Sequence, residues 1–164
     1  MIKIQSSTDI KKVRRLVLDA QGLGHNKPFG KSQTGALATI EHLGYIQLDS
    51  ISVIERAHNH TWSSRVPGFN PDMSNELLEA GKIYEYWAHA ASYLPMKDFR
   101  YSLPDKKSVR DGVLHKRRSK DRKLMGNILK RIEAEGPLGS KDFEDTRENK
   151  TGWWDWKPAK KAIE

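Results

Sequence analysis

Polar and apolar side chains alternate along the short stretch around Gln47. Tyr45, Gln47 and Asp49 fall on one side of a two-residue period, while Ile46 and Leu48 fall on the other. Successive side chains of a β-strand point to opposite faces. We therefore expect a short strand whose polar side chains share one face and whose apolar pair is buried behind them.

Two interpretations of Asp49 follow from this pattern. An amide and a carboxylate side by side on a rigid element can orient and activate water, which would make Gln47 and Asp49 a catalytic pair. Asp49 also suits the N-cap of a helix running through Ile51, Val53 and Ile54. Spacing alone favours the cap, because helix caps are much more common than catalytic pairs.

Helical spacing of apolar residues surrounds this stretch. It predicts helices over residues 10–20, 32–43, about 50–62 and 72–80, with Gly22, Gly44 and Gly81 placed to end three of them. Residues 83–94 are rich in aromatic side chains and have strand character at both ends. Helices followed by a β element predict a winged helix, a domain that typically lays one helix in the DNA major groove.

Two aromatic residues of the 83–94 segment, Trp87 and Tyr93, are expected to help close the core. His89 lies between them and is interpreted as a hydrogen-bonded structural histidine in preference to a catalyst. Arg56, Asn59 and Arg65 have side chains suited to phosphate or base edges, though each is equally ordinary on a solvated surface. His58 and His60 are two residues apart and are poor joint metal ligands on a helix.

The character of the chain changes after Pro95, where basic residues accumulate. The basic residues of this segment are Lys106, Lys107, Arg110, Lys116, Arg117, Arg118, Lys120, Arg122 and Lys123. They predict a connector, helical in part, that tracks a phosphate backbone; the alternative is a solvated linker with no specific partner. Beyond it, apolar spacing from Leu124 to Ile132 predicts another helix, and three tryptophans follow at Trp153, Trp154 and Trp156.

These patterns predict a mainly α fold with small β elements, an α+β class, arranged as tandem winged-helix units. We expect a first winged-helix domain over residues 1–100, a basic connector over 101–120 and a partial second winged-helix domain over 121–164. The second unit is expected to be incomplete because no strand pair follows its helices before the sequence ends.

Charge and composition narrow the classes of partner and chemistry. The formal net charge of +8 and the pI near 9.6 favour a polyanionic partner, nucleic acid before anionic membrane. No apolar run approaches the roughly 18 residues of a membrane span, and no signal-peptide pattern opens the chain. The absence of cysteine excludes disulfide scaffolds, thiol nucleophiles and thiolate metal sites, and it fits a reducing cytosol.

Several of these segments together resemble the winged-helix DNA glycosylases of the YcaQ type, relatives of the azinomycin-crosslink glycosylase. The matching blocks are Leu43 to Asp49, Arg56-Ala57-His58, Glu85 to Pro95, Glu135 to Leu138 and Gly152 to Lys157. They follow the family's order over most of residues 8–164. The Gln-apolar-Asp triplet and the Tyr-Trp-Ala-His block are specific in combination. Family members have tandem winged-helix domains and are much longer than this chain.

The resemblance implies a monofunctional DNA glycosylase that hydrolyses the N-glycosidic bond of N7-alkylated purines and unhooks DNA interstrand crosslinks. Gln47 and Asp49 match the family's catalytic triplet in its Gln-apolar-Asp form, so with the resemblance the catalytic interpretation of Asp49 is favoured over the cap, and Asp49 can serve both roles. No lysine lies in the triplet, which favours direct hydrolysis over a Schiff-base route. No metal or cofactor is expected.

The expected partner is double-stranded DNA with alkylated or crosslinked purines, bound by a monomer in the cytoplasm at the nucleoid. The residues expected to contact that DNA are Arg56, His58, Asn59, Arg65, His89, Lys116, Arg117, Arg118 and Lys120. The alternative from another class is a non-catalytic winged-helix DNA-binding protein, such as a transcriptional regulator. Release of a base from alkylated DNA separates the two.

Overall fold

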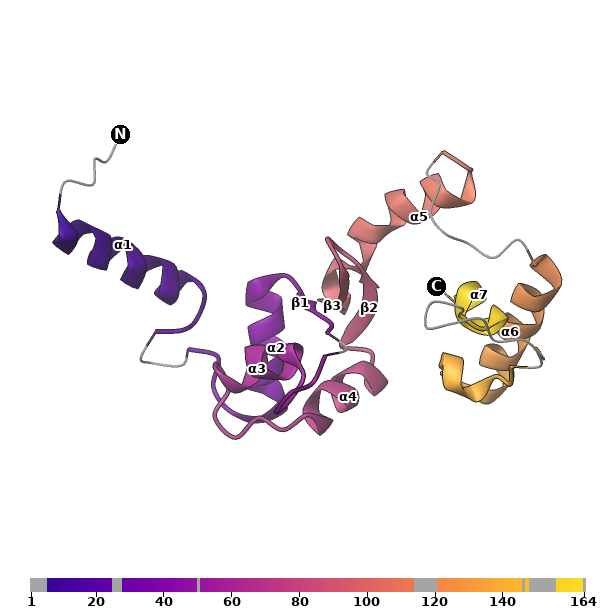
Figure 1. Ribbon diagram of the computed structural model, residues 1–164, viewed down its shortest axis with the longest axis horizontal. Helices are drawn as coiled ribbons and strands as arrows, with labels where there is room; N and C mark the ends of the chain where they lie inside the picture. The colour runs from indigo at the N-terminus through magenta and orange to yellow at the C-terminus, as the bar shows by residue number, and fades with distance from the viewer. Residues whose placement is uncertain are drawn as a thin grey trace. The chain divides into compact units, whose positions relative to one another are not determined.

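The computed structural model describes residues 6–24, 28–49, 51–113, 121–145, 147 and 156–163. The chain divides into two compact units, residues 1–104 and 105–164, and each has its own hydrophobic core. The described residues are mainly helical with a small antiparallel sheet, so the predicted fold class is confirmed (Figure 1).

The first unit begins with helices and ends with a hairpin and a 3₁₀ segment. Its helical elements are α1 (Ser7–Ala20), α2 (Ser32–Leu43), α3 (Ala57–Ser63), α4 (Asp72–Glu79) and η1 (Met96–Ser102). Helix α2 packs against α4, while α3 and α4 contact the sheet. Gly44 ends α2 with a φ of +83°, a backbone conformation that favours glycine. The chain turns there and enters the first strand.

The sheet has three strands in the order β1-β3-β2, all antiparallel. They are β1 (Ile46–Gln47), β2 (Ile83–Trp87) and β3 (Ala91–Pro95). Gln47 pairs with Ser92, and one residue further on the Leu48 N–H donates to the Ala91 carbonyl at 2.8 Å. This register brings the end of β1 beside the turn that joins β2 to β3.

The core of the first unit is centred on Trp62, which is fully buried. Its indole N–H donates to the Ala36 carbonyl at 3.0 Å, and its ring stacks on Phe69 with centroids 5.4 Å apart. The buried hydrophobic residues of this unit are Ala36, Ile40, Ile46, Trp62, Val66, Leu77, Ile83 and Tyr93. The expectation for Tyr93 is confirmed. The expectation for Trp87 is wrong, since its side chain is 53% exposed on β2.

The first half of the helix expected over residues 50–62 is also absent. Helix α3 begins only at Ala57, and residues 51–56 form a turn closed by an isolated antiparallel bridge between Ser52 and Arg56. The apolar side chains that suggested a helix there lie in solvent. Ile51 and Ile54 are spaced for one face of a helix and Val53 is not, and the β-branched residues and the local bonds of Asp49 favour a turn.

Helix α1 contributes no buried residue, although its apolar side chains form the stripe expected from the sequence. Val13 and Val17 are 40% and 54% exposed. The end of α1 is held by two polar contacts: Arg65 Nε donates to the Gln21 carbonyl at 2.8 Å, and His42 Nε2 lies 2.7 Å from the Ala20 carbonyl.

The second unit is built on a smaller core. Its elements are α5 (Leu103–Arg110), which crosses the boundary between the units, α6 (Arg122–Glu135), η2 (Ser140–Asp142) and α7 (Pro158–Ile163). Asp121 caps α6 by accepting from the Leu124 N–H at 2.9 Å. Ile128, Phe143 and Ala159 are its buried hydrophobic residues. No helix among the described residues has the length and hydropathy needed to cross a membrane.

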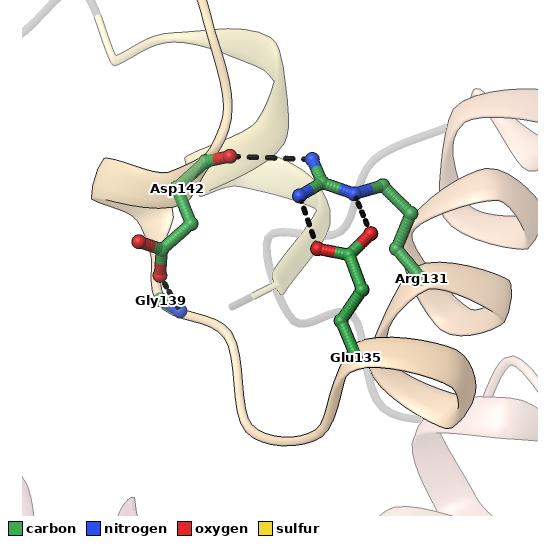
Figure 2. A network of polar contacts seen from close by, with 4 residues as sticks. All are labelled: Arg131, Glu135, Gly139 and Asp142. Atoms are coloured by element: carbon green, nitrogen blue, oxygen red, sulfur yellow. Dashed lines mark hydrogen bonds and ion pairs between the residues drawn. The ribbon is translucent and has the colours of Figure 1, made fainter.

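Arg131 ties α6 to the segment that follows it (Figure 2). Its guanidinium forms a two-point ion pair with Glu135 at 2.6 and 2.7 Å and donates to the Asp142 carbonyl at 3.2 Å. The same group lies over the Phe143 ring, 4.7 Å from its centroid. The Asp142 carboxylate in turn accepts from the Gly139 N–H at 2.7 Å. The hydrogen bond to Arg131 lowers the pKa of Glu135.

Candidate functional site

Strand β1 presents its polar side chains away from the core. Ile46 is 2% exposed and belongs to the core cluster, and Leu48 is partly buried against it. Gln47 is exposed and Asp49 is half-buried. The alternation expected from the sequence is therefore confirmed, and it leaves the Gln47 amide exposed on β1 and the half-buried Asp49 carboxylate two residues beyond it.

The hairpin turn brings His89 to Gln47. His89 Nε2 lies 3.3 Å from Gln47 Oε1, and the His89 ring meets Tyr45 edge-on with centroids 6.0 Å apart. The Ala88 N–H donates to the Ala90 carbonyl at 3.0 Å, a hydrogen bond that spans two residues and closes the turn that carries the histidine. His89 is thus hydrogen-bonded, as expected, but it is exposed and its partner is the proposed catalytic amide.

Sequence reasoning did not find this pairing of His89 with Gln47, which are 42 positions apart in the chain. The signal that could have found it is the strand register. Once β1 is placed beside β3, the residues just before Ala91 must lie beside the end of β1. The sequence contained both strands but not their order in the sheet.

Asp49 is held by two local hydrogen bonds. Its Oδ1 accepts from the Ile51 N–H at 2.8 Å, and its own N–H donates to His58 Nδ1 at 3.4 Å. The predicted N-cap role is wrong in detail, because the carboxylate closes a turn two residues ahead and caps no helix. The Oδ1 atom of this half-buried carboxylate is therefore held by the backbone of the turn.

His58 connects Asp49 to the core. Its side chain is 5% exposed and its ring meets Tyr93 of β3 edge-on, with centroids 5.9 Å apart. Burial lowers the pKa of His58, and the positive charge of Arg56 lowers it further, against the opposing effects of Glu55 and Asp49. A neutral ring that accepts at Nδ1 is the form these surroundings favour. His58 was expected to touch DNA; the structure gives it a place behind Asp49.

The other residues expected to contact DNA differ in exposure. Arg56 is exposed at the start of α3, whereas Asn59 and Arg65 are 5% and 7% exposed. The Arg65 guanidinium donates to the carbonyls of Gln21 and Thr61, so it braces the end of α1. The Asn59 side chain bonds to the Glu55 carboxylate, and among the described residues its Oδ1 is buried without a partner.

Lys116, Arg117, Arg118 and Lys120 lie outside the described residues, as do Trp153 and Trp154. Within the described residues no group of three or more histidine, aspartate or glutamate side chains is placed to hold a metal ion. The structure therefore brings together two groups of residues. Tyr45, Gln47 and His89 form the first. Asp49 and His58 form the second, and the backbone between Gln47 and Asp49 connects the two groups.

Comparison with known proteins adds an independent observation. A sequence model of a protein family, described as DNA glycosylase AlkZ-like, matches residues 40–164. The matched range contains Gln47, Asp49, His58 and His89, and it includes residues of both units. No solved structure matched this chain.

Proposed function

This chain belongs to the AlkZ-like family of DNA glycosylases, and from that premise we propose that it hydrolyses the N-glycosidic bond of N7-alkylated purines in double-stranded DNA, including purines joined in an interstrand crosslink. The observation that supports the proposal is the exposed Gln47 amide at the end of β1, with the Asp49 carboxylate two residues further on and held at Oδ1 by the Ile51 N–H. We propose a monofunctional enzyme that acts as a monomer built from winged-helix units.

The chemistry of the substrate fits this small set of groups. Alkylation at N7 places a positive charge on the purine, so the base is a good leaving group and needs little acid catalysis. What remains is an oxocarbenium-like sugar and a water molecule to capture it. The Asp49 carboxylate would stabilise the sugar cation and take the proton of that water, which the Gln47 amide would hold in place.

The neighbouring residues have positioning roles in this proposal. The contact between His89 Nε2 and Gln47 Oε1 would fix which way the amide points, because an imidazole N–H selects the amide oxygen. His58 would hold the backbone of Asp49. Arg56, exposed at the N-cap of α3, would meet a phosphate.

The test is single-turnover release of N7-methylguanine from a duplex that contains one such base. Asp49→Asn keeps the shape of the side chain and an oxygen for the Ile51 N–H, but it removes the negative charge and the basicity. We expect the rate to fall by about 100-fold or more, the usual scale of such contributions. Gln47→Ala should slow the reaction less, since a poorly held water can still react.

The matched control is Asp98→Asn, the same change at a half-buried aspartate in η1. It should leave the rate within about twofold, and thermal melting of all three variants should stay near that of the wild type. Equal rates for the wild type and Asp49→Asn would contradict the assignment of Asp49. DNA binding without release of any alkylated base would favour the non-catalytic DNA-binding protein instead.

A further inference from the structure

The turn that follows Asp49 carries three of the most exposed apolar side chains in the described part of the chain. We call residues 51–55 the apolar loop. Ile51, Val53 and Ile54 are 71%, 92% and 90% exposed. Single exposed apolar side chains are normal on a protein surface, but three within four residues form a projecting apolar tip.

Both ends of the apolar loop are fixed. At its start the Ile51 N–H donates to Asp49 Oδ1 at 2.8 Å, and at its end Ser52 pairs with Arg56 just before α3 begins. Valine and isoleucine are branched at Cβ and have few side-chain rotamers. The tip therefore consists of exposed apolar side chains with few rotamers, and a hydrogen bond joins it to the carboxylate that we propose as catalytic.

The charges around the tip suit a DNA surface. Glu55 is the acidic residue of the apolar loop, and its carboxylate accepts from the Arg56 N–H at 2.7 Å and bonds to the Asn59 side chain. It is thereby held against the start of α3. The Arg56 side chain is exposed at the base of the loop. A cation beside an apolar tip is the pairing that a phosphate backbone and a base stack would meet.

A glycosylase that flips a single alkylated base from a duplex moves that nucleotide out of the base stack, and DNA-binding proteins often open a stack with an apolar wedge. We propose that the apolar loop is this wedge, and that Val53 and Ile54 enter the stack beside the target nucleotide while Arg56 contacts the adjacent phosphate. The inference rests on the proposed function. It extends the proposed function by naming the segment that enters the DNA and the parts of the DNA that its exposed side chains contact.

The first measurement reports base unstacking and needs no catalysis. The probe is a duplex with 2-aminopurine next to a 2′-fluoro N7-methylguanosine, whose glycosidic bond resists hydrolysis. The fluorescence of 2-aminopurine rises when it leaves the stack. At saturating protein the wild type should raise the signal, and Val53→Ser/Ile54→Ser should lose most of that rise. Val113→Ser, the same change at a valine that is 74% exposed in the other unit, should behave as the wild type.

The second measurement compares excision of N7-methylguanine from duplex and from single-stranded DNA. Unstacking in a duplex costs a few kcal/mol, so the double variant should be slower on duplex by about 10- to 100-fold. On the single strand, which needs no wedge, its rate should stay within about twofold of the wild type. Thermal melting should be unchanged, because the replaced side chains are in solvent.

The two measurements separate this inference from the proposed function. If the bound wild type unstacks 2-aminopurine but releases no base, the result would contradict the glycosylase proposal and support the wedge. An equal fluorescence rise for wild type and double variant, no rise with the wild type, or an equal loss of rate on duplex and single strand would each overturn the wedge.

Discussion

His58 joins α3 to the backbone of Asp49, and the protonation state of its ring decides whether it can do so. Only the neutral ring can accept the Asp49 N–H at Nδ1. Because burial lowers the pKa of His58 in the folded state, the unfolded chain takes up a proton at a higher pH than the folded chain. The stabilisation by the neutral ring is therefore fully present above about pH 6.5, the ordinary value, and is lost as the pH falls below it.

This prediction is tested with two substitutions at His58. His58→Asn keeps an acceptor near the position of Nδ1 but cannot be protonated, whereas His58→Leu removes the acceptor. We expect His58→Leu to lower the free energy of unfolding by about 1 kcal/mol or more at neutral pH. The measurement is urea unfolding from about pH 5 to about pH 8. The wild type should lose more stability than His58→Asn on acidification, and parallel curves would contradict the prediction.

The site residues show how far sequence reasoning goes at this scale. Gln47 and Asp49 could be found from an alternation and a three-residue motif, because both are local features. The contact of Gln47 with His89 depends on the order of strands in the sheet. The burial of Asn59 and Arg65 depends on how α3 and the residues after it pack, so residue type alone could not show whether either side chain contacts DNA or is buried.

Among the elements, helix α2 has a close contact that makes a specific prediction. Gly35 is buried in α2, and a Cβ added there would lie 2.8 Å from the backbone carbon and oxygen of Gly30. Alanine is ordinarily better than glycine inside a helix by about 1 kcal/mol. Here the clash with rigid backbone should dominate, so Gly35→Ala should destabilise the first unit by about 1 to 3 kcal/mol.

The control for this substitution lies in α6 of the other unit. Gly126 is an exposed glycine inside that helix, and no atom lies within 4 Å of an added Cβ. Gly126→Ala should therefore stabilise the second unit by about 1 kcal/mol. Amide hydrogen exchange followed residue by residue measures each unit separately. Stabilisation by both substitutions would show that the loop before α2 yields to the new methyl group.

Helices could be predicted where apolar residues recur at helical spacing and a glycine marks the end of the helix. Helices α2 and α6 lie where apolar spacing placed them and end at Gly44 and Gly136, both with positive φ. The start of α3 was not predictable in this way. Apolar residues at 51, 53 and 54 led to the expectation of a helix there, yet the structure leaves them in solvent. A pattern rule assumes that apolar residues are buried, so it fails where they are exposed.

For the whole molecule, net charge makes the next prediction. With a formal charge of +8, binding to DNA should weaken steeply as salt is added. We expect replacement of Arg117, Arg118 and Lys120 by glutamine to flatten the plot of log affinity against log salt by roughly two to three units, near 0.9 for each lost phosphate contact. Fluorescence anisotropy over a salt series measures the slope.

The control replaces three basic residues of α1, Lys11, Lys12 and Arg15, by glutamine and so removes the same charge elsewhere. Similar flattening by both triple variants would show that overall charge, and not the connector, determines the slope. The predicted boundaries of the winged-helix domains are a related proposal at this scale. The chain divides between residues 104 and 105, so the fragments 1–104 and 105–164 are the ones to produce separately when these boundaries are tested.

The contrast between Trp62 and Trp87 has an optical consequence. Trp62 has no contact with solvent, so its emission should lie at short wavelength and resist quenching by iodide. Trp87 is 53% exposed on the hairpin that carries His89, so its emission should lie at longer wavelength and be quenched readily. Trp62 and Trp87 are thus two of the chain's five tryptophans, and each is read alone in a variant whose other four tryptophans are replaced by phenylalanine. The emission of Trp62 should report whether the first unit is folded. The emission of Trp87 should change when a ligand binds at the turn beside Gln47.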